Sequence, residues 1–231
     1  IMPIVSGRRP RRRYRKKRAQ TYAQKTVRKI AQKVVNSSKE TKRTIVETGD
    51  EQSVSLLSTA SNFLLTSVSQ GDSSYTRNGD KIYAMNLKGS YIITNQNSFA
   101  AYVRVLIVSD KTQDVNVSTT EFFEGVNDTD MTISDARTAG FHVPLVAKIN
   151  TQKCYAIYDR VHKIDPVMTR TNMYKYNVKL NRQMVYDGAE STTSKPLHRF
   201  RMVILGVDAT NDEVSGSIEF SGQCHLFFKD M

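Results

Sequence analysis

The 231-residue sequence contains no tryptophan and only two cysteines, Cys154 and Cys224. Two cysteines are too few for a disulfide framework and lack the spacing of a metal site. We therefore expect buried thiols, with a single disulfide between them as the alternative. No apolar run approaches the roughly 18 residues that a membrane-spanning helix needs. The basic N-terminal region is not followed by the apolar stretch of a signal peptide, so we expect no membrane partner.

Recognisable catalytic motifs are also lacking. The four histidines are scattered along the chain: His142, His162, His198 and His225. None stands at a metal-ligand or triad-like spacing, and no HExxH, GxSxG or glycine-rich phosphate loop occurs. We therefore expect no enzymatic activity and no cofactor. Oxygen ligands cluster in NDTDMTISD, from Asn127 to Asp135, but without the glycine and terminal glutamate of an EF-hand loop. Calcium at this loop is the alternative to a plain polar loop.

Positive charge is abundant and gathered at one end of the chain. The formal net charge is +12, from 34 basic and 22 acidic residues. Residues 1–43 contain 16 of the basic residues and one acidic residue, Glu40, for a net charge of +15. Residues 44–231 contain 18 basic and 21 acidic residues, for a net charge of −3. A slightly acidic body with a basic tail indicates a polyanionic partner.

The basic tail has two parts. Nine of the residues in GRRPRRRYRKKRAQTY, from Gly7 to Tyr22, are Lys or Arg. Apolar residues then recur at helical spacing: Ala23, Val27, Ile30 and Val34. This spacing predicts a short basic amphipathic helix that ends near Asn36. The helix is open to three interpretations: binding to nucleic acid, a membrane-surface or mitochondrial-targeting role, or a solvated charged surface. The preceding block of nine charges favours nucleic acid.

Arginine explains what such a block can bind. Guanidinium groups pair bidentately with phosphate oxygens, and each neutralised phosphate releases counterions, which makes binding salt-dependent. These contacts recognise phosphate and not base sequence. Tyr14 and Tyr22 are suited to stacking on unpaired bases. The same residues are compatible with a nuclear localisation signal.

The body, residues 44–231, is predicted to be one all-β domain because its apolar residues alternate with period two. In KIYAMNLKGSYII the alternation places one set on one face: Tyr83, Met85, Leu87, Tyr91 and Ile93. In SIEFSGQCHLFF it does the same for Ile218, Phe220, Cys224, Leu226 and Phe228. Further strands are expected at 43–47, 100–110, 153–165, 174–188 (one strand or two) and 197–208. Long connections between them favour a Greek-key sandwich or jelly roll over an up-and-down barrel.

Several segments together resemble the coat proteins of small icosahedral viruses. They are the arginine-rich arm, QGDSSYTRNGDKIYAMNLKGSYIITNQ, AYVRVLIVSD, FRMVILGVD and the closing apolar strand. The likeness is strongest to circular Rep-encoding single-stranded DNA (circovirus-like) viruses, and RNGDKI is also similar to the coat protein of satellite tobacco necrosis virus. The resemblance implies an eight-stranded antiparallel jelly roll and a homo-oligomer of sixty copies in a T=1 shell. It further implies packaged single-stranded nucleic acid, DNA in preference to RNA, and localisation in the virion and in the host nucleus during assembly.

The resemblance also implies which residues of the arm, residues 1–43, contact nucleic acid. They are Arg8, Arg9, Arg11, Arg12, Arg13, Arg15, Lys16, Lys17, Arg18, Lys25, Arg28, Lys29 and Lys33. The main alternative is a cellular nucleic-acid-binding β-protein with a basic tail, which would remain monomeric or small once nucleic acid is removed. A jelly-roll binding domain of lectin or cytokine type is a further alternative, although the arm would have no use in it.

Overall fold

The computed structural model of this chain describes residues 22, 24–31, 34, 40–47, 52–56, 61–111, 122–123, 145, 147–186, 199–209 and 216–231. The chain forms two compact units, Ile1–Glu40 and Thr41–Met231. In the described part of the chain, no helix has both the length and the apolar character needed to cross a bilayer.

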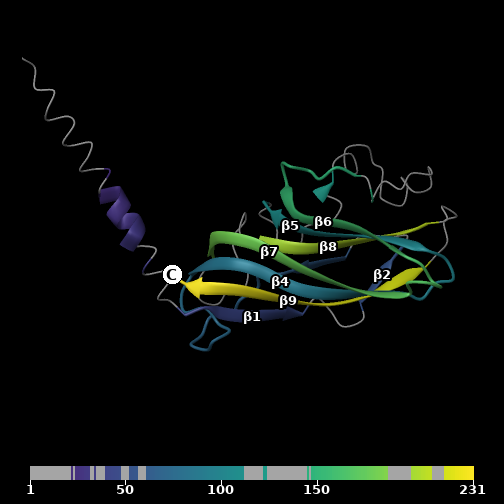
Figure 1. The fold of residues 1–231 in the computed structure, drawn as a ribbon, viewed down its shortest axis with the longest axis horizontal. Coiled ribbons are helices and arrows are strands. Elements are labelled where there is room, and N and C mark those ends of the chain that lie inside the picture. The colour runs from purple at the N-terminus through teal and green to yellow at the C-terminus, as the bar shows by residue number, and fades with distance from the viewer. Residues whose placement is uncertain are drawn as a thin grey trace, which may run out of the picture. The chain divides into compact units, whose positions relative to one another are not determined.

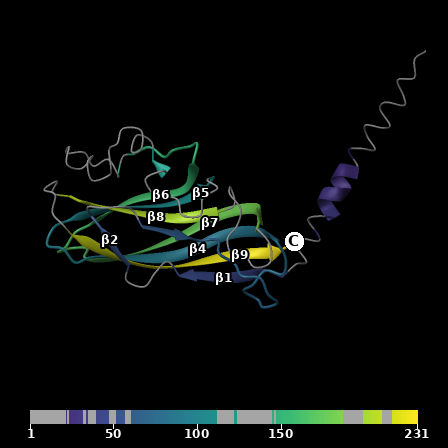
Figure 2. The same cartoon turned by 180° about the vertical axis from the view of Figure 1, so that it is seen from behind.

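The second unit consists of two antiparallel sheets, seen from opposite sides in Figures 1 and 2. One sheet has the order β1 (Lys42–Glu47), β9 (Ser217–Asp230), β4 (Lys81–Asn95) and β7 (Thr171–Val185), with β2 (Gln52–Ser55) also paired to β9. The other has the order β3 (Ser61–Leu64), β8 (Arg199–Asp208), β5 (Ala101–Asp110) and β6 (Cys154–Ile164).

These strands form a jelly roll. β1 pairs with one part of β9 and β2 with the part before it, so the two act as one interrupted strand. Counted in this way, eight strands pass between two four-stranded sheets through non-consecutive neighbours, which is the double Greek key of a jelly roll. The predicted all-β, eight-stranded jelly roll is therefore confirmed.

The core lies between the sheets and contains the predicted face of β9. All five apolar residues of that face have no exposed surface: Ile218, Phe220, Cys224, Leu226 and Phe228. The Phe220 ring stacks with Phe63 at a centroid distance of 6.2 Å and with Tyr91 at 5.5 Å. Each fully buried apolar side chain of this size stabilises the fold by about 1.5 to 3 kcal/mol.

The predicted face of β4 is wrong in its first half. Tyr83 and Met85 were expected on the same side as Leu87, but both are only half-buried, whereas Ala84 is buried. The reason is a register shift between Ala84 and Asn86 in the pairing with both neighbouring strands. A β-bulge adds one residue and reverses the alternation of side chains beyond it. Sequence periodicity alone does not reveal such an insertion.

The structure differs from the predicted strands in two places. Two short strands, β2 and β3, lie where a long connection was expected, and the segment predicted as one or two strands forms the single strand β7. β2 and β3 have only four residues each, too short to show a convincing alternation. β7 runs unbroken through Asn181, which takes a positive φ of 46°. Asparagine is among the residues that tolerate this conformation. The segment predicted as one or two strands is thus a single strand.

The RNGD turn before β4 is organised around a buried arginine. The Arg77 side chain is fully buried, and its guanidinium donates to the carbonyl oxygens of Val68 at 3.2 Å and Gly79 at 2.6 Å. It also lies 4.4 Å from the ring centroid of Tyr186. The RNGD motif thus contains a buried side chain that holds the loop together.

Candidate nucleic-acid interface

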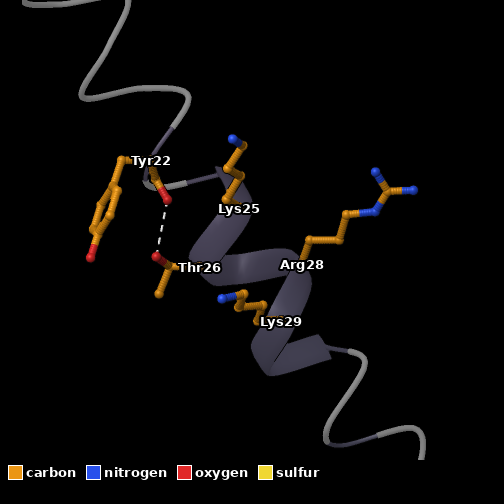
Figure 3. Close-up of a pocket in the computed structure, with 5 residues that line it drawn as sticks. All are labelled: Tyr22, Lys25, Thr26, Arg28 and Lys29. Atoms are coloured by element: carbon orange, nitrogen blue, oxygen red, sulfur yellow. Dashed lines mark hydrogen bonds between the residues drawn. The ribbon is translucent and has the colours of Figure 1, made fainter. Parts of the chain in front are cut away.

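The predicted helix of the arm is confirmed over residues 24–31, with Tyr22 and Val34 also helical. Lys25, Arg28 and Lys29 are exposed on it. The Thr26 hydroxyl donates to the carbonyl oxygen of Tyr22 at 3.0 Å, one turn earlier (Figure 3). Figure 3 shows the Arg28 guanidinium extended away from the helix, on the side opposite the Tyr22 ring.

Acidic residues are missing from this stretch, because the sequence from Tyr22 to Val34 contains no Asp or Glu. The charges of the basic side chains are therefore not neutralised within the helix. Its apolar residues Val27, Ile30 and Val34 are exposed as well. Such a helix has cations available for phosphate oxygens and an aromatic ring, Tyr22, exposed beside them.

Some of the predicted site residues lie outside the described residues. These are Arg8, Arg9, Arg11, Arg12, Arg13, Arg15, Lys16, Lys17, Arg18 and Lys33. The loop from Asn127 to Asp135, named above for calcium, lies outside them too, as do His142 and His198. Within the described ranges, no three His, Cys, Asp or Glu side chains come together as a metal site.

The two cysteines are buried and unpaired with each other, as expected. Burial raises the pKa of Cys154 to about 12 and that of Cys224 to about 11. Thiols with such pKa values remain protonated near neutral pH, and a protonated thiol is a poor nucleophile. Neither side chain is therefore suited to covalent chemistry.

His162 belongs to a polar cluster inside the sandwich. Its Nε2 lies 2.8 Å from the hydroxyl of Tyr91, which also lies 2.9 Å from the hydroxyl of Tyr158. Its ring is 3.7 Å from that of Tyr174. Burial, and then the nearby positive charge of Arg160, lowers the pKa of His162. The cluster links β4 and β7 of one sheet to β6 of the other.

The outer face of the β3-β8-β5-β6 sheet is covered. Leu106 of β5 and Val203 of β8 point outward from the core and are fully buried. Phe122, Phe123 and Ala147 pack against them, from the segment that connects β5 to β6. This face is therefore not open to a partner at its centre.

The outer face of the β1-β9-β4-β7 sheet is open, and its exposed charges are basic. The side chains of Arg43, Lys88, Lys175 and Lys179 are exposed on it, and the strand registers place them on the same side of the sheet. We call these four residues, together with His225 and Phe227 between them, the basic face. Glu219 is the acidic side chain that the structure describes on this side, and it accepts a hydrogen bond from Gln96.

The basic face was not identified from the sequence, although one signal was present. In β7, Lys175, Asn177 and Lys179 alternate with the inward residues Tyr176 and Val178. This alternation shows that the lysines share a face. It does not show that Lys88 and Arg43, far away in sequence, extend the same face across two other strands.

The chain matches no protein-family model and no curated protein. It is similar to the structure of the infectious bursal disease virus Gx strain, with a TM-score of 0.38 and 9% identity over 83% of this chain and 33% of that one. It thus spans about a third of the length of that protein.

Two further similar structures are closer to this chain in length. For Desmodium yellow mottle tymovirus the TM-score is 0.34 and the identity 10%, over 81% of this chain and 86% of that one. The second is the semi-empty virus-like particle of the nodavirus of the giant freshwater prawn Macrobrachium rosenbergii. Its TM-score is 0.30 and its identity 15%, over 84% of this chain and 97% of that one. A likeness at these TM-scores does not identify a function.

Proposed function

We propose that this protein is a viral capsid protein that assembles into a T=1 shell of sixty copies and packages single-stranded nucleic acid through its arm. The observation that carries the proposal is the union of two features in one chain. One is an eight-stranded jelly roll, and the other is the basic arm, whose residues 1–40 precede β1 and have a net charge of +13. The jelly roll is an architecture that recurs in capsid proteins, lectins and cupins, and of these it is a capsid subunit that needs a polycationic tail.

The folded unit suits a shell. A jelly roll is a rigid two-layer body, and closed point-group symmetry lets one chemically identical surface make the same contact many times. The connections from β3 to β4 and from β5 to β6 are long, residues 65–80 and 111–153, and loops on a rigid scaffold commonly supply the contacts to partners. Each subunit has one such folded unit, residues 41–231, and so contributes one building block to the shell.

The arm suits retention of a long polyanion. One arm on its own makes weak, salt-sensitive phosphate contacts. Many arms confined in one shell act on the same molecule, so their weak contacts sum to tight retention. Residues 1–40, which precede β1, have a net charge of +13, so sixty arms supply about 780 positive charges, enough for roughly 780 phosphates by direct neutralisation.

The packaged molecule in this proposal is circular single-stranded DNA in preference to RNA, and the location is the virion. The same arginine-rich block would serve as a nuclear localisation signal during assembly in the host nucleus. The preference for DNA and the nuclear step rest on the resemblance of the arm and the strand segments to circovirus-like coat proteins.

Size-exclusion chromatography with nuclease treatment tests the proposal against a cellular nucleic-acid-binding protein. The purified full chain is expected to elute as one large species whose nucleic acid resists added nuclease until the protein is denatured. The released material should then be digested by DNase and not by RNase. A protein that becomes monomeric once nucleic acid is removed, under every salt condition, would contradict the shell.

A further inference from the structure

We propose that the basic face of the jelly roll is a second binding surface for single-stranded nucleic acid, separate from the arm. The inference rests on the proposed function for the class of its partner. In a shell, this sheet face would be the one turned toward the packaged molecule.

The first argument is that charge is segregated within the folded unit. The folded unit, residues 41–231, has 20 basic and 21 acidic residues and so a net charge of −1, yet the exposed charged side chains at the centre of the basic face are all positive. A polyanion is therefore attracted to this outer side of the sandwich.

The second argument is the arrangement of the basic side chains in neighbouring rows. The strand registers give one row of Arg43, Phe227, Asn86 and Lys179, a second of Ile45, His225, Lys88 and Asn177, and a third of Glu47, Gln223, Ser90 and Lys175. Successive rows lie about 7 Å apart, and four strands span about 14 Å. The cations thus cover an area wide enough for one extended strand of nucleic acid.

The third argument is that these cations are available. Among the described residues no ion pair involves Lys88, Lys175 or Lys179. Glu219 belongs to the row of Thr94 and Thr171, about 13 Å along the strand from Lys175. Glu47 belongs to the row of Lys175 but lies on β1, three strands away, which is about 14 Å across the sheet. None of the described carboxylates is therefore paired with these lysines in competition with a phosphate group.

The fourth argument is the presence of rings beside the charges. The Lys88 ammonium lies 5.4 Å from the ring centroid of Phe227, and the His225 and Phe227 rings are 6.4 Å apart. A sheet that offers both cations and rings is a recurrent platform for single strands.

A hollow at the edge of the sheet extends this surface. It is lined by Thr41, Arg43, Thr44, Ile45, Ser74 and Tyr75. Tyr75 is 62% exposed, and the backbone nitrogen of Arg43 donates to the carbonyl oxygen of Ser74 at 3.3 Å. Tyr75 thus lines the same hollow as Arg43, which belongs to the basic face. An unpaired base stacked on Tyr75 would bring its phosphate toward Arg43.

The composition of the rows that carry the cations favours nucleic acid over a second copy of this chain. The exposed large apolar side chains described on this side are Ile45, in the row of Lys88, and Ile92 and Met173, which pair with each other one row beyond Lys175. The rows that carry the cations contain mainly polar and basic side chains. Subunit contacts are usually depleted of lysine in their core.

The test is the salt dependence of binding of the full chain to a labelled oligothymidine, measured by fluorescence anisotropy. In the triple variant Lys88→Gln, Lys175→Gln and Lys179→Gln, the slope of log binding constant against log salt should become shallower by about 2. The matched control replaces three exposed lysines outside this sheet by glutamine, Lys148, Lys153 and Lys163, and should leave the slope unchanged. Replacing the three face lysines by arginine should also preserve it.

Tyr75→Ala provides an independent check, because it removes a ring and no charge. It should weaken binding about tenfold at every salt concentration, with the slope unchanged. Tyr75→Phe should retain the wild-type affinity.

Two results would overturn the inference. In the first, the face variant and the control variant change the slope equally. In the second, the face variant loses shells while its slope stays that of the wild type, which would assign the face to a subunit contact. A shallower slope in a protein that never forms shells would instead refute the proposed capsid role and leave the binding face standing.

Discussion

Replacing Phe220 by alanine should remove a large part of the stability of the folded unit. The side chain has no exposed surface, and its ring contacts those of Phe63 and Tyr91 from the two sheets. Truncating a buried phenylalanine to alanine lowers the free energy of unfolding by about 3 to 5 kcal/mol. The loss has two parts, the transfer free energy of the removed ring and the cost of the cavity that it leaves. Aromatic pairs add to this cost. We therefore expect a loss of about 4 kcal/mol, against a total stability of about 5 to 15 kcal/mol for a typical domain.

The loss corresponds to a melting temperature lower by about 8 to 16 °C for a unit of this size. Circular dichroism is the suitable readout, because the chain has no tryptophan for fluorescence. It should be applied to subunits kept dissociated, since shell contacts would add to apparent stability. The matched control is Gln223→Ala on the opposite, exposed face of the same strand, which should change stability by less than about 0.5 kcal/mol. Equal losses for both variants would refute the register of β9.

Three further predictions concern the arm and pH. Replacing the nine basic residues from Arg8 to Arg18 by glutamine should make the slope of log binding constant against log salt shallower by about 6 for oligonucleotide binding. The change should be equal for two unrelated sequences, and a sequence-dependent change would refute phosphate recognition. Deleting residues 1–35 should preserve the β-sheet circular dichroism spectrum while lowering the copurified nucleic acid, and loss of the spectrum would mean that the arm belongs to the core. The melting temperature should fall as pH drops below about 6.5, because burial lowers the pKa of His162 and the unfolded chain therefore takes up the proton first. His162→Gln should flatten part of this pH dependence, and a curve parallel to that of the wild type would show that His162 does not contribute to it.

The sequence predicted those parts of the fold that depend on uninterrupted local patterns. The alternation in β9 identified all five of its buried residues, because no bulge interrupts the strand between Ile218 and Phe228. The helix at 24–31 was predictable because its apolar residues recur at helical spacing without glycine or proline.

The parts that were not predicted depend on pairing between distant segments. The bulge after Ala84 is visible only in the register of β4 against β7 and β9. Burial of Arg77 depends on the carbonyl oxygens and on the Tyr186 ring that surround it, and a charged residue in a turn is ordinarily expected in solvent. The basic face likewise arises only when β1, β9, β4 and β7 are placed side by side.

Electron microscopy of the purified full chain tests the capsid assignment most directly. The proposal predicts uniform spherical particles, with the symmetry and copy number of a T=1 shell and with density inside that weakens when the arm is deleted. Absence of closed particles at every salt concentration, with and without added single-stranded DNA, would contradict it.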